Sequence, residues 1–139
     1  MLLHILARGK IGRSPEAELV DRYIKRIAWP TRVTELGERA RLPPLPPSSI
    51  SVALDERGKA LSSAELARTL ESWRDGGKRE ARFLIGAAGG HGEVERDTAD
   101  LLLSFGPATW PHLLVRAMLA EQLFRATSIL ANHPYHREG

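Results

Sequence analysis

Two segments, FLIGAAGGHG (residues 83–92) and LLLSFGPATWPHLLVRAMLAEQLFRATSILANHPYHRE (residues 101–138), carry the clearest structural signals in the chain. The apolar run Phe83–Ile85 leads directly into glycines, which is typical of a buried strand that ends in a loop. We expect a helix over about Glu93–Leu103, then a short strand with a loop over Ser104–Pro111. The last helix is expected over about His112–Ile129.

The same alternation of strand and helix extends back to the N-terminus. Leu2–Ala7 is an apolar run that predicts a buried strand, and Val33–Leu36 predicts a second strand. Between them, Ser14 followed by Pro15 marks a helix start, because a hydroxyl caps the first turn and proline suits its first position. Strands that alternate with helices in this way predict an α/β domain with a mostly parallel sheet.

The middle of the chain contains one segment that cannot form regular structure. The prolines of Leu42–Ser49 lack amide donors, so we expect an extended linker within the domain. Ile50–Leu54 then predicts a third strand, and Asp55–Lys59 predicts a turn. Ser62 with Glu65 forms a capping box that opens the next helix.

Length and composition bound what the chain can be. Its 139 residues fit one domain, residues 1–139, and the formal net charge is +3. With no cysteine, the chain has no disulfide, thiolate metal site or cysteine nucleophile. The sequence shows no apolar run of the roughly 18 residues typical of a membrane helix, and its N-terminus does not resemble a secretory signal. We therefore expect a cytoplasmic protein.

The last helix is apolar on nearly every face. Between Leu113 and Leu130 its only charged residues are Arg116, Glu121 and Arg125. Such a helix must be buried on more than one side. A second copy of the chain is the simplest partner, so a dimer is favoured; the alternative is a central core helix in a monomer.

Three further features have both a functional and a structural interpretation. The loop Gly86–Gly92 matches neither a Walker loop nor GxGxxG, so ligand loop and simple connector both remain open. His112, His133 and His136 do not have the spacing of a zinc site. A cluster of basic residues is either a solvated face or a phosphate-binding surface: Arg8, Lys10, Arg13, Arg22, Lys25, Arg26 and Arg32.

The two C-terminal segments closely resemble the ribosomal RNA large subunit methyltransferase H family. The matching motifs are Ile85–Gly86, the loop from Leu103–Ser104 to Pro111–His112, Arg116, and Pro134–Tyr135–His136. The stretch Ala53–Ser63 also fits, and the resemblance covers nearly the whole chain.

This resemblance implies a fold and an activity that periodicity does not reveal. The fold is a single-domain α/β trefoil-knot (SPOUT-like) methyltransferase, homodimeric, with S-adenosyl-L-methionine as cofactor and no metal. The activity is methylation of N3 of a pseudouridine in 23S ribosomal RNA, carried out on assembled ribosomes. The alternatives are a non-catalytic ribosome-binding factor with the same fold and a methyltransferase of another RNA uridine.

The resemblance also implies site residues. Residues 131–139 would form a C-terminal substrate tail that reaches the partner's pocket, where Arg116 would hold a phosphate or a base carbonyl and His136 or His112 would accept the proton. The implied substrate side consists of His112, Arg116, Tyr135 and His136. The implied cofactor pocket consists of Leu54, Gly86, Phe105, Gly106, Pro107, Ala108, Thr109 and Trp110.

The sequence departs from the family pattern at two places. Ala87 and Ala88 replace the second glycine and its neighbour in the usual Gly-Gly-x-x-Gly loop. The prolines of Leu42–Ser49 stand where relatives usually have another helix. We expect the second change to leave the cofactor and tail motifs untouched.

Overall fold

The computed structural model describes residues 1–86 and 92–135, with only the backbone of Glu93. Five parallel strands form one sheet in the order β2-β1-β4-β3-β5. The α/β fold class with a parallel sheet, predicted from the sequence, is confirmed. The strands are β1 (Leu2–Arg8), β2 (Thr31–Leu36), β3 (Ser49–Ala60), β4 (Glu80–Ile85) and β5 (Leu101–Ser104).

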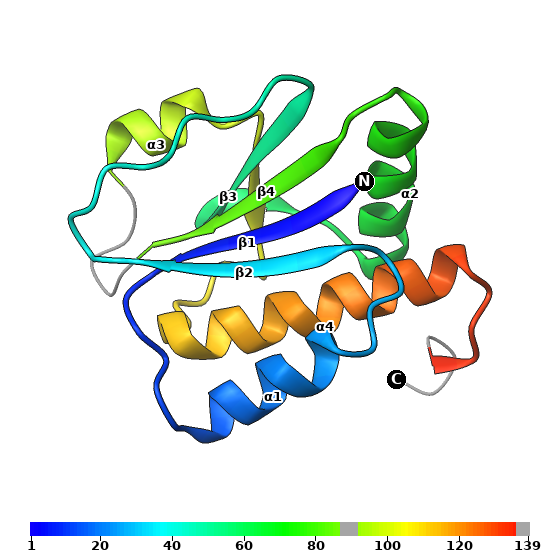
Figure 1. Cartoon of the computed structure of the whole chain (residues 1–139), viewed down its shortest axis with the longest axis horizontal. Coiled ribbons are helices and arrows are strands. Elements are labelled where there is room, and N and C mark those ends of the chain that lie inside the picture. Colours follow the sequence, from blue (N-terminus) through cyan, green and yellow to red (C-terminus); the bar gives the residue numbers. More distant parts are fainter. Residues whose placement is uncertain (87–91, 136–139) are drawn as a thin grey trace.

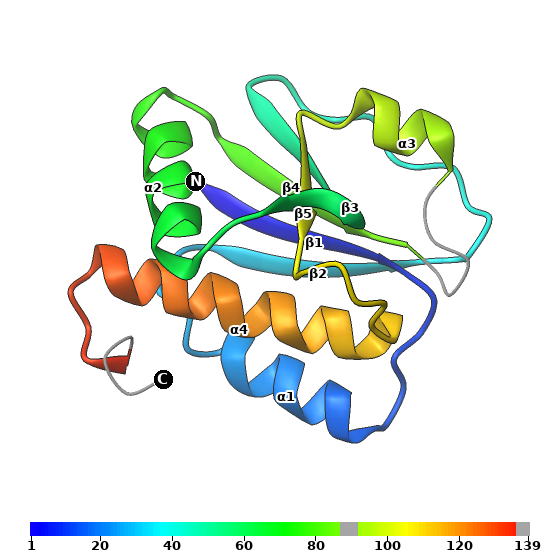
Figure 2. The same ribbon diagram turned by 180° about the vertical axis from the view of Figure 1, so that it is seen from behind.

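Helices lie on both sides of this sheet. Two of them, α1 and α4, run next to each other along one face, and α2 stands beside the C-terminal part of α4 (Figures 1 and 2). The short α3 lies on the other side of the strands from α4, at the end of the molecule opposite α2 (Figure 1). The helices are α1 (Pro15–Ile24), α2 (Ser63–Asp75), α3 (Glu93–Thr98) and α4 (His112–Leu130). None of those described combines the length and apolar character needed to cross a bilayer.

The hydrophobic core lies between the sheet and α1, α2 and α4. Alternate residues of β1 and β4 point into it, as the period-2 geometry of strands requires. Nine residues of α4 are buried within the single chain. The main core side chains are Leu3, Ile5, Val52, Leu54, Leu66, Leu70, Phe83, Ile85, Leu103, Leu119, Leu123 and Phe124. Much of the apolar surface of α4 is therefore covered without a partner chain.

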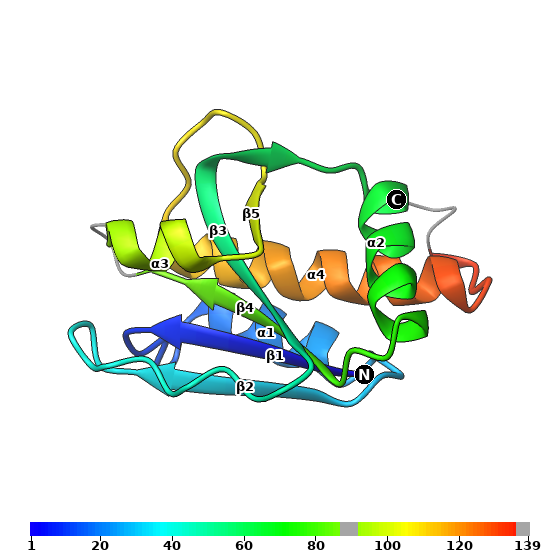
Figure 3. The same ribbon diagram turned by 90° about the horizontal axis from the view of Figure 1, so that it is seen from above.

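The connection between β2 and β3, which includes the proline-rich residues 42–49, is tied to the other face of the sheet. Arg8 donates to the carbonyl oxygens of Gly37, Glu38 and Ala40 at 3.1, 3.3 and 2.7 Å, and Arg82 donates to Pro43 O at 2.8 Å. Prolines offer carbonyls but no amides, so donors from the sheet are the partners they need. Residues 40–46 form neither helix nor strand, in agreement with their proline content. Figure 3 shows this segment following β2 back to the start of β3.

Two sequence expectations about local structure are wrong. Asp55–Lys59 is not a turn, because β3 continues to Ala60 with a break in register between Leu54 and Lys59. The helix expected over Glu93–Leu103 ends at Thr98, and Leu101–Ser104 is strand β5. Pairing with β3 outweighs helix propensity for the three consecutive leucines, since β5 joins the edge of a sheet that buries Leu103.

Candidate functional site

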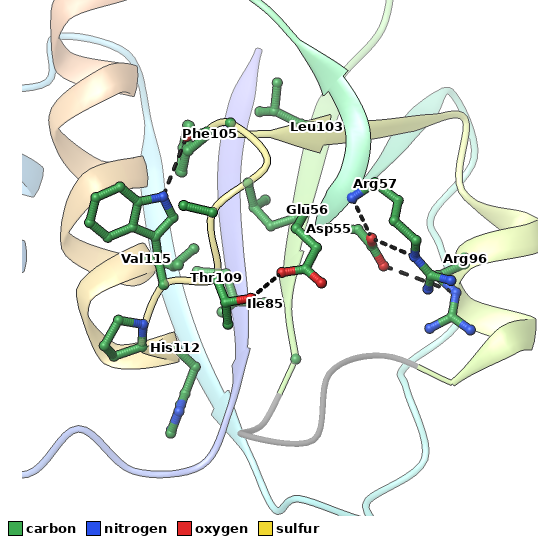
Figure 4. Close-up of a pocket in the computed structure, with 16 residues that line it drawn as sticks. Asp55, Glu56, Arg57, Ile85, Arg96, Leu103, Phe105, Thr109, His112 and Val115 are labelled. Carbon is green, nitrogen blue, oxygen red and sulfur yellow. Dashed lines mark hydrogen bonds and ion pairs between the residues drawn. The ribbon is translucent and has the colours of Figure 1, made fainter.

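A cavity of about 590 Å³ lies where β3, β4 and β5 end. Ligands of parallel α/β sheets bind at the carboxyl ends of the strands, and small-molecule sites typically measure about 300–1,000 Å³. The start of α4 lies on one side of the cavity and α3 on the other (Figure 4).

The irregular part of β3 forms one wall. The residues between the two registers, Asp55, Glu56, Arg57 and Gly58, are displaced from the ladder, and the first three line the cavity. Gly58 allows the strand to return to β5, because a Cβ there would lie 2.6 Å from the carbonyl carbon and oxygen of Leu102. A side chain at this position would collide with the β5 backbone.

The loop between β5 and α4 forms the facing wall. Ser104 holds its first turn, since its Oγ donates to Gly106 O at 2.8 Å and accepts from Gly106 N at 3.0 Å. Gly106 has φ +104°, a conformation that favours glycine. Thr109 Oγ1 donates to Glu56 Oε2 at 2.7 Å and so joins this loop to the β3 wall across the cavity (Figure 4).

A charged group occupies the end of the cavity nearest α3. The Asp55 side chain is 8% exposed; its Oδ1 accepts from Arg57 N at 2.9 Å and Arg57 Nε at 3.3 Å. Oδ2 lies 4.0 Å from Arg96 Nε. Burial raises the pKa of Asp55, but the hydrogen bonds from Arg57 and the charges of Arg57 and Arg96 outweigh burial and lower the pKa below its ordinary value. Asp55 is therefore ionised at neutral pH.

The structure brings together most of the residues implied as a cofactor pocket. Seven of the eight line the cavity, and Pro107 is the exception. His112, the first residue of α4, also lines it, although it was implied on the substrate side. Ala87 and Ala88 lie outside the described residues.

Arg116 does not line this cavity. It is 1% exposed, and its guanidinium donates to Glu35 Oε2 and to Gly9 O at 3.2 Å. Its contact with a phosphate or a base carbonyl of the substrate stays a prediction, and within the single chain its guanidinium is bonded to these two partners. These hydrogen bonds connect α4 with β2 and the loop after β1.

Tyr135 lies at the far end of α4 from His112. The 19 residues of α4 span about 28 Å at 1.5 Å per residue, and Figures 1 and 2 show the tail at the end of the helix opposite α3. Tyr135 Oη donates to Glu121 Oε2 at 3.0 Å, and the Arg125 guanidinium carbon lies 4.9 Å from the Tyr135 ring centroid. Burial and the hydrogen bond to Glu121 raise the pKa of Tyr135. His136 lies outside the described residues.

Sequence reasoning missed several residues that line the cavity. Asp55, Glu56 and Arg57 were assigned to a turn, and Arg96 was not singled out within the predicted helix. An acidic pair directly after a buried strand is a signal that could have placed Asp55 and Glu56 at the ligand edge of the sheet. No three His, Asp or Glu side chains come together as a metal-binding group in the described part of the chain.

Comparison with known proteins identifies the family of this chain. A family model described as "Predicted SPOUT methyltransferase" matches residues 1–136. The chain belongs to the SPOUT methyltransferase family.

Individual SPOUT relatives agree with this assignment. A protein of Rhizorhabdus wittichii named "Ribosomal RNA large subunit methyltransferase H" is 68% identical over 100% of both chains, and one of Novosphingobium aromaticivorans with the same name is also 68% identical over 100% of both. The solved structure of a probable methylase family protein from Haemophilus influenzae superposes with a TM-score of 0.59 at 12% identity. That match covers 94% of this chain and 66% of the other, and it supports the fold alone.

Membership in a SPOUT methyltransferase family implies a methyl donor, and the cavity fits one. Its wall residues combine apolar side chains such as Leu54, Ile85 and Phe105 with charged groups at one end. That mixture suits a ligand with a flat aromatic part and a charged part.

Proposed function

We propose that this SPOUT methyltransferase transfers a methyl group from S-adenosyl-L-methionine to N3 of a pseudouridine in 23S ribosomal RNA, on assembled ribosomes in the cytoplasm. The observation that carries the proposal is the cavity at the strand ends, which gathers Leu54, Gly86 and most of the loop Phe105–Trp110. Relatives 68% identical over their full length bear the name of a ribosomal RNA large subunit methyltransferase, which supports ribosomal RNA as the substrate.

Methyl transfer requires the donor and the acceptor to be aligned rather than reactive groups of the protein. S-adenosyl-L-methionine supplies an activated methyl group, and its transfer is an in-line displacement that needs no enzyme nucleophile. The protein holds donor and acceptor in line and excludes water. The Ser104–Gly106 turn and the Thr109–Glu56 hydrogen bond give the loop wall a defined shape before the donor binds.

We further propose that the active protein is a homodimer in which the tail of one chain completes the cavity of the other. His112 and Tyr135 lie at opposite ends of α4 within one chain, so one protomer cannot bring both to one substrate. An antiparallel arrangement of two α4 helices places the tail of each beside the cavity of the other.

The exposed side of α4 has the character of such an interface. Leu114 and Met118 are only half-buried and do not belong to the core. Gln122 and Arg125 are half-buried too and follow them at helical spacing, so all four lie on one side of the helix. The half-buried residues between the two ends of α4 therefore form a continuous stripe that a second copy can cover.

Within this composite site, His112 and the tail residues Tyr135 and His136 act on the RNA base. N3 carries a proton at neutral pH, so a proton acceptor beside it assists transfer. His112 lines the cavity where a methyl donor would lie. Arg116 contributes as a positioning residue, since its buried guanidinium fixes the start of α4 that carries His112.

Incubation of the protein with methyl-labelled S-adenosyl-L-methionine tests the proposal. The substrates are ribosomes from cells that lack the modification, free 23S RNA and tRNA. We expect label in 23S RNA from assembled ribosomes, mapped to a pseudouridine. Label in tRNA or in a different uridine would replace the substrate assignment. Donor binding without label on any RNA would point to a non-catalytic ribosome-binding factor.

A further inference from the structure

The basic residues that lie close together in the N-terminal sequence are separated by the fold. Arg8 is 7% exposed and its guanidinium is bonded to backbone carbonyl oxygens, and Lys25 forms an ion pair with Asp21 at 2.8 Å. Lys10 and Arg13, by contrast, are exposed in the loop that follows β1. The cluster is therefore neither wholly a solvated face nor wholly a binding surface.

A second loop brings two more cations to the same edge of the sheet. β1 and β2 are parallel neighbours whose ends are joined by a backbone hydrogen bond of 2.7 Å, so the loops after them begin side by side. The loop after β2 carries the exposed Arg39 and Arg41. Residues 9–14 and 37–47 together contain four cations and a single carboxylate, that of Glu38.

These four cations, which we call the basic edge, are Lys10, Arg13, Arg39 and Arg41. Among the described residues, none of the four forms an ion pair. The charge of Lys10 helps to lower the pKa of Glu35, but that carboxylate is bonded to Arg116 instead. An exposed group of unpaired cations with little negative charge beside it attracts an anionic partner.

The basic edge continues along the sheet into the cavity. The strand order is β2-β1-β4-β3-β5, so the loops after β2 and β1 lie next to the end of β4, where the cavity begins. Figure 3 shows that β1, β2 and β4 all end on the side where α3 and the start of α4 lie. A partner that covers the basic edge therefore also reaches the cavity.

Hydrogen bonds attach both loops to elements of the cavity. Arg8 donates to Ala40 O at 2.7 Å and to Glu95 Oε1 on α3 at 2.7 Å, so the turn after β2 is connected to the helix beside the cavity. Gly9 O accepts from Arg116 on α4, the helix whose first turn lines the cavity. Both loops are thus held in position before a partner binds, which lowers the entropic cost of binding.

We propose that the basic edge binds the phosphate backbone of the RNA whose base enters the cavity. This inference rests on the proposed function. Every nucleotide carries a negatively charged phosphate, so a base cannot approach the cavity without bringing its flanking phosphates to the neighbouring surface. Contacts from lysine and arginine to phosphates fix the register and orientation of a nucleic acid without reading its sequence. The basic edge therefore positions the RNA, while the cavity carries out the methyl transfer.

Methylation of ribosomes by two double variants tests this. One variant combines Arg39→Gln with Arg41→Gln, and the other combines Lys10→Gln with Arg13→Gln. Each lost phosphate contact reduces the slope of log affinity against log salt by about 0.7–0.9. We therefore expect KM for ribosomes to rise at least about tenfold at 0.1 M salt, with a salt dependence less steep by about 1.5. The kcat and the calorimetric affinity for S-adenosylhomocysteine are expected to stay unchanged.

The matched control removes two arginines from the opposite edge of the same sheet. Arg32 lies near the start of β2 and Arg79 directly before β4, and both are exposed. Strands of six residues keep the two edges about 20 Å apart, which is about two Debye lengths at 0.1 M salt. The variant with Arg32→Gln and Arg79→Gln has the same net charge as the edge variants and is expected to keep the wild-type KM. Thermal melting verifies folding, and if the Lys10 and Arg13 variant does not fold, the Arg39 and Arg41 variant decides.

The possible failures are distinguishable. If the edge variants keep the wild-type KM, or if the control raises KM equally, the basic edge is refuted while the methyl-transfer proposal stands. A raised KM with the salt dependence of wild type would show a contact other than phosphate and has the same meaning. If wild-type protein methylates no ribosomes, the proposed function fails. Co-sedimentation with ribosomes then tests the basic edge by itself, and equal binding by wild type and edge variants would refute it.

Discussion

Arg116 on α4 donates a hydrogen bond from Nη1 to Oε2 of Glu35 on β2, although the two residues are 81 positions apart in the chain. The same Glu35 oxygen accepts from the Ile11 amide at 2.8 Å, and Arg116 Nη2 donates to Gly9 O at 3.2 Å. One buried cation thus connects α4, β2 and the loop after β1. Because Arg116 lies one turn beyond His112, this connection also sets where the cavity end of α4 lies.

Removal of the Glu35 charge is expected to destabilise the fold. Glu35→Gln leaves the guanidinium of Arg116, 1% exposed, without its counter-charge. Because water reaches Glu35, we expect a loss of about 1–3 kcal/mol in the free energy of unfolding, below the range for fully buried pairs. Urea unfolding at pH 7 measures it. Glu71→Gln, which removes an exposed partner 3.9 Å from Arg74, is the control and should cost less than about 0.5 kcal/mol.

The same pair predicts a pH dependence. Burial raises the pKa of Glu35, but hydrogen bonds from Arg116 and Ile11 and the charges of Arg116 and Lys10 outweigh it, so the pKa is lowered. A carboxyl with a lowered pKa stabilises the fold above its unfolded pKa of about 4.3 and loses that contribution as the pH falls through the folded value. The difference in melting temperature between wild type and Glu35→Gln should therefore shrink below about pH 4. A difference that stays constant from pH 7 to pH 3 would contradict the assignment.

The hydrogen bond between Thr109 and Glu56 predicts an effect on donor affinity rather than on stability. Thr109→Val keeps the shape of the side chain and removes the donor to Glu56 Oε2. The two cavity walls then lose their connection, and S-adenosyl-L-methionine should bind about threefold to tenfold more weakly, as for one hydrogen bond of about 1 kcal/mol. Thr69→Val on α2, whose Oγ1 donates to Glu65 O at 2.8 Å, is the matched control. Equal affinities in the two variants would show that the connection is irrelevant to binding.

Local sequence signals predicted most of the fold because many of them act over a few residues. The cap at Ser14 and the capping box of Ser62 with Glu65 both appear as expected. The failures at Asp55–Lys59 and at Leu101–Ser104 have one cause. Leu101–Ser104 pairs with β3, and Asp55–Lys59 is held between Leu54 and Lys59, which both pair with Leu103. Such pairing, 40 to 50 positions apart, leaves no periodic trace in either segment alone.

The site could be predicted only in part, for a similar reason. Motif residues such as Leu54 and Gly86 came from the family resemblance, and the structure gathers them in one cavity. Glu56 lines the cavity because part of β3 is displaced, and Arg96 lines it because of the position of α3. No local sequence pattern specifies either arrangement. The burial of Arg116 was also unpredictable, because its partner Glu35 comes from a strand near the N-terminus.

A side chain at Gly58 is expected to destabilise the protein, because the backbone of β5 lies too close to this position. A Cβ at Gly58 would lie 2.6 Å from Leu102 C and O and 2.9 Å from Leu103 N, so Gly58→Ala forces β3 and β5 apart. We expect a loss of about 1–3 kcal/mol in the free energy of unfolding, together with weaker donor binding. Gly37→Ala is the control, since its Cβ would meet only the Ala40 side chain at an ordinary 3.8 Å. Similar stability of the two variants in urea unfolding would contradict the close approach.

The separation of His112 and Tyr135 along α4 predicts that two inactive variants restore activity to each other. Ala108→Trp fills the cavity from the loop wall, and Tyr135→Ala removes the tail side chain that contacts Glu121. Each variant alone should lose methyl transfer. If the tail of one chain completes the cavity of the other, a mixed dimer contains one intact site, formed by the cavity of the Tyr135→Ala chain and the tail of the Ala108→Trp chain.

Random exchange of equal amounts makes half of the dimers mixed, so the mixture should recover about a quarter of wild-type activity. The measurement is transfer of labelled methyl groups to ribosomes after the two variants have been unfolded together and refolded. Each variant refolded alone is the control for recovery. A site contained in a single chain leaves every protomer of the mixed dimer with one defect, and the mixture would then stay as inactive as its parts. The recovered fraction therefore decides whether the roughly 28 Å between the ends of α4 is bridged by a second chain.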